Sequence, residues 1–260
     1  MNSNLIVGEM IRRYNFNGYP EEYRVSLVNA LDKIRGVFKD NLLSVTLGGS
    51  GGKNKIIDGW SDLDIYIILK KYDIEQISLL QEELDDSKIH IGLTFYNLYE
   101  IENDLVDFKT KIMVYEKNNY DVNPTLYGID YFKDVDYLEV YNNDMMNYPV
   151  VLQAFKRMYI EVLNNKRKID KSYIKKMLVL LKCILSSHKI FAFGYDEVFR
   201  TFIGLLYNSD IDISLKDIII DLENNEDYII NISREIIEYT TYTDLFNKND
   251  RNFKKRILGG

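Results

Sequence analysis

The chain has 260 residues, of which 46% are hydrophobic, and this is typical of a globular protein with room for one large domain or two small ones. The net charge is −7, and no run of about twenty apolar residues is present, so we expect no transmembrane helix and no membrane partner. The first residues lack the apolar core of a signal peptide, and Cys183 is the only cysteine, so no internal disulfide can form. These features predict a cytoplasmic protein.

The charge is divided unevenly along the chain. Residues 1–144 carry 15 basic and 25 acidic side chains, a net of −10, whereas residues 145–260 carry 18 basic and 15 acidic side chains, a net of +3. An acidic surface disfavours the phosphate backbone of nucleic acid and favours cationic substrates. The positive excess in the second half either faces a phosphate-bearing ligand or is ordinary solvated surface.

Hydrophobic periodicity predicts alternating helices and strands in the first half. The expected elements are a helix at 21–38, strands at 42–47 and 63–69, a helix at 73–84 and a third strand at 88–96. This order predicts a mixed sheet with helices on one side. A short apolar run at 111–115 indicates a further strand, and 116–146 receives no assignment.

From about Asn147 onward the pattern becomes helical. Helical spacing of apolar residues predicts five segments, namely 147–165, 171–189, 195–208, 214–223 and 226–247. The change predicts two domains, 1–146 and 147–260. The predicted fold class is therefore α+β, with a sheet domain followed by a helical bundle.

A glycine-rich turn and a pair of carboxylates lie between the first two predicted strands. The turn Gly48–Gly52 leaves the first strand, and Asp62 and Asp64 lead the second. Residues i and i+2 of a strand point to the same face, so the two carboxylates project side by side. Such like charges repel unless a cation lies between them, and Mg²⁺ or Mn²⁺ is the expected hard ion. Backbone N–H groups of the turn can approach phosphate oxygens, so the pattern predicts phosphoryl or nucleotidyl transfer.

This pattern resembles the signature of the nucleotidyltransferase superfamily, which includes DNA polymerase β and the antibiotic nucleotidyltransferases. The matching residues are Leu47, Gly49-Ser50 and Ser61-Asp62-Leu63-Asp64, with eleven residues between Ser50 and Asp62. The motif covers residues 47–64, and the order of elements extends the resemblance to about residue 97. Antibiotic-modifying members also carry a helical bundle after the catalytic domain. In this chain, residues 1–146 would form the catalytic domain.

The resemblance implies transfer of NMP, with AMP as the leading expectation, from an NTP such as ATP to a hydroxyl group. Asp62 and Asp64 would bind the metal and act as the catalytic residues, while Gly48, Gly49 and Ser50 would hold the phosphates. The implied acceptor is a small cationic molecule resembling an aminoglycoside, as in antibiotic resistance enzymes. A protein side chain or a nucleic-acid end is the alternative acceptor.

The third predicted strand departs from the family pattern, which implies a third carboxylate there. Its site-facing residues carry no acid, and Gly92 occupies the acid's position. Either two carboxylates suffice, or Glu100 or Glu102 arrives from the following segment, or the chain is a non-catalytic nucleotide-binding regulatory module. His90, on the same side of the strand, is either a metal ligand, a general base or a structural residue.

Other residues have two interpretations each. Lys182 interrupts an apolar run, so it either binds phosphate or extends its ammonium to solvent. Trp60 either stacks on a base or anchors the loop by packing. Asp196 and Glu197 either bind the acceptor or favour a helix N-terminus. His188 is expected to be a capping or surface group.

Overall fold

The computed structural model describes residues 16, 18–85, 87–137, 148–187, 190–207 and 214–242. The chain divides into two compact units, Met1–Tyr141 and Asn142–Gly260, and each is described by itself. The first contains a four-stranded sheet with helices, and the second is helical, so the predicted α+β class is confirmed. Among the described helices, none is both long enough and apolar enough to span a membrane.

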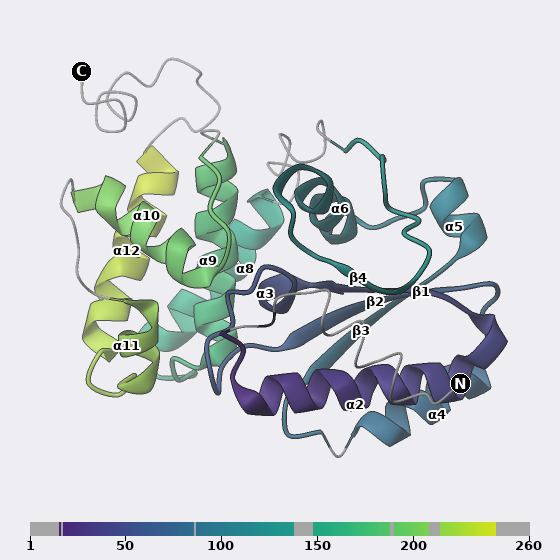
Figure 1. Ribbon diagram of the computed structural model, residues 1–260. Helices are drawn as coiled ribbons and strands as arrows, with labels where there is room; N and C mark the ends of the chain where they lie inside the picture. The colour runs from purple at the N-terminus through teal and green to yellow at the C-terminus, as the bar shows by residue number, and fades with distance from the viewer. Residues whose placement is uncertain are drawn as a thin grey trace. The chain divides into compact units, whose positions relative to one another are not determined.

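The sheet of the first unit is mixed, as predicted. Its strands are β1 (Leu42–Gly48), β2 (Leu63–Leu69), β3 (Ile91–Asn97) and β4 (Thr125–Gly128). They lie in the order β3-β2-β1-β4 (Figure 1). β1 is antiparallel to both β2 and β4, whereas β2 and β3 run parallel.

One face of the sheet packs on the helices α2 (Glu21–Phe38) and α4 (Ile74–Leu84) (Figure 1). Side chains of a strand alternate between faces, and the apolar residues of β2 that join this core are Leu63, Ile65, Ile67 and Leu69. The residues between them, beginning with Asp64, therefore point to the opposite face.

The opposite face is covered by α6 (Phe108–Tyr120), so the expectation of helices on one side only was wrong (Figure 1). Tyr66 and Ile68 of β2 pack there against Met113 and Val114 of α6. The predicted strand at 111–115 was also wrong, because that run is the middle of this helix. A short apolar run does not distinguish a strand from a helix that is buried along this part of its length.

The described part of the first unit also contains three short elements: the 3₁₀ helix Lys39–Asn41, α3 (Gly49–Gly52) and α5 (Leu98–Glu102). The second unit contains α8 (Tyr148–Leu163), α9 (Lys171–Ser187), α10 (Tyr195–Tyr207), α11 (Leu215–Ile220) and α12 (Glu226–Tyr242). These are the five predicted helices, with ends that differ by a few residues. Buried aromatic rings such as Phe155 and Phe199 fill its interior, and the Tyr173 hydroxyl hydrogen-bonds the Ser233 hydroxyl at 2.8 Å, joining α9 to α12.

Candidate functional site

Sheet register places three residues of the sequence pattern in one row. Gly48 at the end of β1 pairs with Asp64 of β2, and Asp64 pairs in turn with Gly92 of β3. Asp64 points to the face covered by α6, and its side chain is 30% exposed. Asp64 is therefore flanked by glycine on both neighbouring strands.

The glycine turn directly contacts the Asp64 carboxylate. Gly49 has a φ of +60°, and a β-carbon added there would lie 2.1 Å from Oδ2 of Asp64. Only glycine adopts this backbone conformation readily and leaves room for the carboxylate oxygen. Ser50 follows in α3, where its backbone carbonyl accepts a hydrogen bond from the Lys55 N–H at 2.9 Å. The fold thus brings the turn and the second carboxylate of the motif together.

The other oxygen of Asp64 has a cationic partner that the sequence did not reveal. Nζ of Lys109, in the first turn of α6, lies 3.0 Å from Oδ1 of Asp64. A β-carbon added at Gly92 would lie 3.4 Å from the same oxygen. The lysine side chain is 67% exposed. A lysine in the first turn of a helix is unusual, because the helix dipole disfavours a cation there. This signal could be recognised in the sequence only if the start of α6 at Phe108 were known.

Hydrogen bonds at the N-terminus of α6 hold this lysine near the sheet. The N-cap Asp107 accepts from the Thr110 N–H at 3.1 Å and from the Thr110 hydroxyl at 2.7 Å, and the Tyr96 hydroxyl of β3 also donates to it. Burial by itself raises the pKa of Asp107, but these hydrogen bonds outweigh it and leave the pKa below its ordinary value. Burial, with the hydrogen bond to Asp107, raises the pKa of Tyr96 to about 12. This carboxylate is therefore an anchor for the helix.

A buried ion pair supports the glycine turn from behind. Nζ of Lys53, the residue after α3, lies 2.6 Å from Oε2 of Glu116 on α6, and the two side chains are 11% and 2% exposed. The Asn123 N–H donates to the Gly52 carbonyl at 2.7 Å, and its side-chain amide donates to the Met113 carbonyl at 3.1 Å. The turn is therefore tied both to α6 and to the segment that enters β4.

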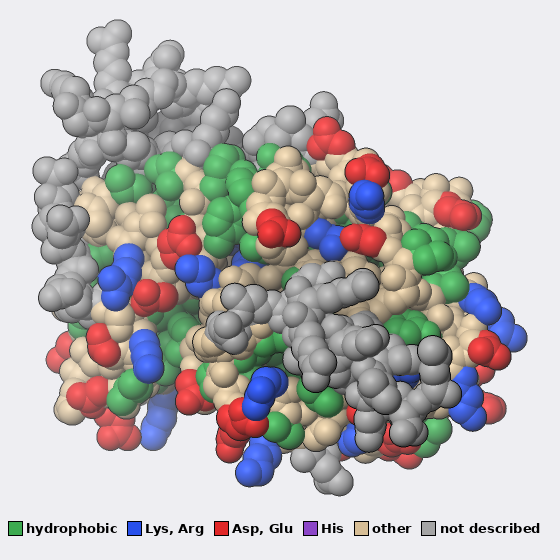
Figure 2. Space-filling view, viewed as in Figure 1, with side chains coloured by type: hydrophobic (Ala, Val, Ile, Leu, Met, Phe, Trp, Pro, Cys, Tyr) green, Lys and Arg blue, Asp and Glu red, His purple; other side chains and the backbone are tan. Residues whose placement is uncertain are grey.

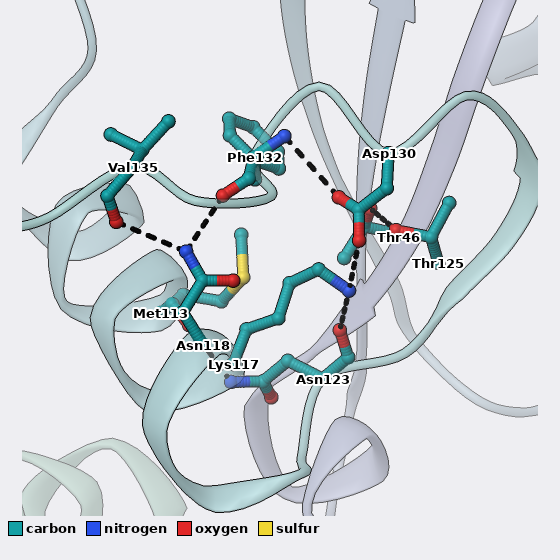
Figure 3. A network of polar contacts seen from close by, with 9 residues as sticks. All are labelled: Thr46, Met113, Lys117, Asn118, Asn123, Thr125, Asp130, Phe132 and Val135. Atoms are coloured by element: carbon teal, nitrogen blue, oxygen red, sulfur yellow. Dashed lines mark hydrogen bonds and ion pairs between the residues drawn. The ribbon is translucent and has the colours of Figure 1, made fainter.

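Figure 3 shows how this network continues toward β4. Lys117 of α6 donates to the Asn123 carbonyl at 3.3 Å and pairs with Asp130 at 2.9 Å. The hydroxyls of Thr46 and Thr125 hydrogen-bond each other at 3.1 Å across β1 and β4. The Lys117 side chain is 9% exposed. Its ion pair with Asp130 is therefore a largely buried link between α6 and the segment that follows β4.

The loop before the carboxylates is also held by buried groups. The Tyr23 hydroxyl donates to the Ser61 carbonyl at 2.9 Å, and the Ser61 hydroxyl accepts from the Ile57 N–H at 2.8 Å. Burial, followed by the charges of Asp58 and Asp62, raises the pKa of Tyr23. Trp60 is 5% exposed, which favours its anchoring interpretation over base stacking. Asp62, the residue immediately before β2, has a half-buried side chain.

The alternative third acids, Glu100 and Glu102, do not reach this site, so that expectation is corrected. Both lie on α5, after the carboxyl end of β3, whereas Gly92 lies near its amino end. The five residues from Gly92 to the end of the strand span about 17 Å. Glu100 also accepts from the Asn97 N–H at 2.9 Å and from the Tyr72 hydroxyl at 2.6 Å, so it caps α5.

His90 lies just before β3, and its side chain is exposed. Its carbonyl oxygen accepts a hydrogen bond from the Leu63 N–H at 3.0 Å, which ties the entries of β2 and β3 together. The contact that the structure shows for His90 is thus a backbone one. A ligand or general-base role stays a prediction.

In the second unit, Lys182 is partly buried on α9, and its role as a phosphate ligand stays a prediction. Asp196 accepts from the Leu215 N–H at 2.7 Å and pairs with Arg200 at 3.0 Å, while Glu197 accepts from the Phe193 N–H at 3.1 Å. These contacts favour the structural interpretation of both acids. His188 lies outside the described residues.

The donor set suits one hard cation better than two. In the ranges that the structure describes, no group of three or more His, Cys, Asp and Glu side chains gathers as a metal site. Asp62 and Asp64 are both partly accessible, and two carboxylates can hold one Mg²⁺ ion whose remaining ligands are phosphate oxygens and water. No acid stands opposite Asp64 on β3 to hold a second ion.

Comparison with known proteins reveals the fold but no sequence family. No family model matches the chain, and no curated protein matches it. The structure is similar to a crystal structure of spectinomycin adenyltransferase AAD(9) from Enterococcus faecialis with ATP and spectinomycin. The TM-score is 0.50 at 17% sequence identity, over 89% of this chain and 95% of that chain. At this coverage the match extends over both units of the chain, and at this identity it is a likeness of fold.

Proposed function

We propose that this protein is a metal-dependent nucleotidyltransferase that moves NMP, with ATP as the leading donor, to a hydroxyl group of a small molecule. The observation that carries the proposal is the contact of the Gly49 turn with the Asp64 carboxylate, since both come from one sequence signature. A turn that presents N–H groups to phosphate beside a metal-binding acid is the arrangement that such transfer requires. The shared fold of an adenyltransferase supports the same reaction class.

In this proposal the chain works mainly by positioning. Backbone N–H groups of Gly49 and Ser50 orient the outer phosphates, and Asp62 and Asp64 hold the divalent ion, which neutralises charge that develops on the phosphate oxygens. The acceptor oxygen forms a bond to the α-phosphorus while the bond from that phosphorus to the bridging oxygen breaks, and pyrophosphate leaves. The hydroxyl proton passes to a carboxylate oxygen of the pair or to water.

Lys182 stays a proposed phosphate ligand. The Lys182→Met variant tests this role through its affinity for the nucleotide.

The acceptor class follows from charge and from the structural neighbour. The first 144 residues carry a net charge of −10, and the neighbour was solved with spectinomycin. Both favour an aminoglycoside-like or aminocyclitol acceptor over nucleic acid. On the face shown in Figure 2, Lys and Arg side chains are interspersed with Asp and Glu side chains, unlike the continuous basic stripe expected of a nucleic-acid binder.

The test is transfer of label from each α-labelled NTP, with Mg²⁺ or Mn²⁺, to spectinomycin, aminoglycosides, lincosamides and cell extract. Asp64→Asn should abolish transfer and remove the metal dependence of NTP binding, because it deletes one of two anionic ligands. Asp58→Asn is the matched control, since it makes the same change on an exposed loop residue. Transfer that persists in Asp64→Asn would place the chemistry elsewhere.

A second candidate function is a nucleotide-binding regulatory module without catalysis. The specific observation in its favour is the pairing of Asp64 with Gly92, which leaves the site without a third acid. Metal-dependent NTP binding without transfer to any tested acceptor would support the module. Labelled product from any acceptor would exclude it.

A further inference from the structure

We infer that the ammonium of Lys109 is the second cation of this site, held by Asp64 in the free protein and passed to the nucleotide's phosphates when one divalent ion binds. The inference rests on the proposed function, which it deepens by assigning a phosphate-binding residue and a metal count. The two oxygens of the Asp64 carboxylate have different neighbours.

Oδ2 of Asp64 faces the glycine turn, whereas Oδ1 faces Lys109 at 3.0 Å. Gly92 makes the second contact possible, since a β-carbon there would already lie 3.4 Å from Oδ1. An acidic residue in place of Gly92 would crowd Oδ1 and add a second negative charge. A metal ion would then be needed to neutralise the two carboxylates. With glycine, the positive charge beside Oδ1 comes from the chain itself.

The location of Lys109 is locally unfavourable and so calls for an explanation. It lies in the first turn of α6, where the helix dipole disfavours a cation. The helix start is fixed by Asp107, Thr110 and Tyr96, so the lysine is kept beside the sheet. A residue that breaks a local rule at a candidate site is expected to serve the function.

The ion pair is built to open. Lys109 and Asp64 are 67% and 30% exposed, and pairs this accessible are weak because water competes for both charges. A carboxylate binds a divalent ion more strongly than it binds an ammonium group. The metal–nucleotide therefore displaces Lys109 from Oδ1 when it arrives. Its nearest new anions are the phosphates held by the Gly49 turn, on the other side of the same carboxylate.

The experiment measures Mn²⁺ binding to the full chain by the spin resonance of free Mn²⁺, with and without a non-hydrolysable NTP analogue. The native chain should bind a single Mn²⁺ with the analogue. Lys109→Met should weaken analogue binding about tenfold, as expected for the loss of one charge-assisted contact. Without the analogue, the same variant should bind Mn²⁺ several-fold more tightly, because the competitor for Asp64 is gone.

Two variants control for charge and folding. Lys109→Arg should stay near the native values in both measurements. Lys111→Met removes the same charge from the same helix, but that lysine pairs with Asp104 at 2.7 Å, so neither affinity should change.

The outcomes separate this inference from the proposed function. If the native chain binds the analogue but takes up two Mn²⁺ ions, the inference is overturned. The same holds if Lys109→Met binds the analogue within twofold of the native chain. If the native chain binds no analogue with either metal, the proposed function itself fails, and the inference falls with it.

Discussion

At the scale of single residues, two glycines stand on either side of the Asp64 carboxylate and act on it differently. Gly49 provides a left-handed backbone conformation and close approach to Oδ2, whereas Gly92 leaves space beside Oδ1. The absence of a side chain is therefore what both positions contribute to the surroundings of this carboxylate. The sequence pattern identified the first as part of the motif and the second as a departure from it.

Gly49→Ala should abolish metal-dependent nucleotide binding while the protein still folds. The new β-carbon would lie 2.1 Å from Oδ2 of Asp64, so the carboxylate must move. The control is Gly59→Ala, which shares a positive φ, +69°, but meets nothing within 4 Å. Both variants should lose about 1 to 2 kcal/mol of unfolding free energy, the cost of the left-handed conformation. Calorimetric titration with a metal–NTP analogue checks this, and equal loss of binding in both variants would contradict it.

At the scale of elements, α6 organises the site although it contributes nothing to the sequence motif. Its first turn carries Lys109 to Asp64, and its third turn places Glu116 against Lys53 behind the glycine turn. Asp107 caps the helix and ties it to β3 through Tyr96. The helix therefore connects the strand that bears the carboxylate with the turn that faces it.

Lys53→Met should cost about 3 kcal/mol of unfolding free energy. It removes the cation 2.6 Å from a carboxylate that is 2% exposed, and removing one partner of a buried ion pair is strongly destabilising. The double variant Lys53→Met/Glu116→Leu should recover most of this loss, because no charge is then left buried. Denaturant unfolding measures both. Lys88→Met is the control, because Lys88 pairs with Glu22 and both side chains are exposed. This variant should change the free energy of unfolding by less than about 0.5 kcal/mol. A single variant as stable as the native chain would refute the argument.

The error over α6 has a physical origin. Ile112, Met113, Val114 and Tyr115 are all buried, so the run has no polar positions to reveal a helical period. Strand and helix are then equally compatible with the local pattern. The N-cap Asp107, which accepts from the Thr110 N–H, was the available signal that a helix starts there.

At the scale of the whole molecule, the charge is divided unevenly between the two halves of the chain. The first 144 residues have a net charge of −10 within a chain whose total is −7. Such a field attracts cations and repels polyanions, and salt screens both effects. Under the proposed function, this charge would favour a cationic acceptor without specifying the molecule.

The affinity for a polycationic aminoglycoside should therefore fall several-fold between about 20 and 200 mM salt, since the Debye length shortens over this range. A neutral sugar acceptor of similar size should show no such dependence. Duplex DNA should not bind at the lower salt concentration, where electrostatic binding is strongest. Isothermal titration and electrophoretic mobility measure these affinities. DNA binding, or salt-independent binding of the aminoglycoside, would contradict the argument.

Local patterns in the sequence were enough to predict several elements of the fold. The apolar run along 63–69 predicted strand β2, and the helical spacing after Asn147 predicted the second unit's helices. The spacing of Asp62 and Asp64 pointed to the site because a strand repeats every two residues.

The neighbours of these residues, in contrast, depend on how distant segments pack together. Lys109 is 45 residues from Asp64 in sequence, and their contact depends on how α6 packs across the sheet. The exclusion of Glu100 likewise follows from the parallel direction of β3, which carries that acid to the far end of the sheet. Neither the Lys109 contact nor the exclusion of Glu100 follows from the local pattern, because each is set by packing between distant segments and not by the period of either one.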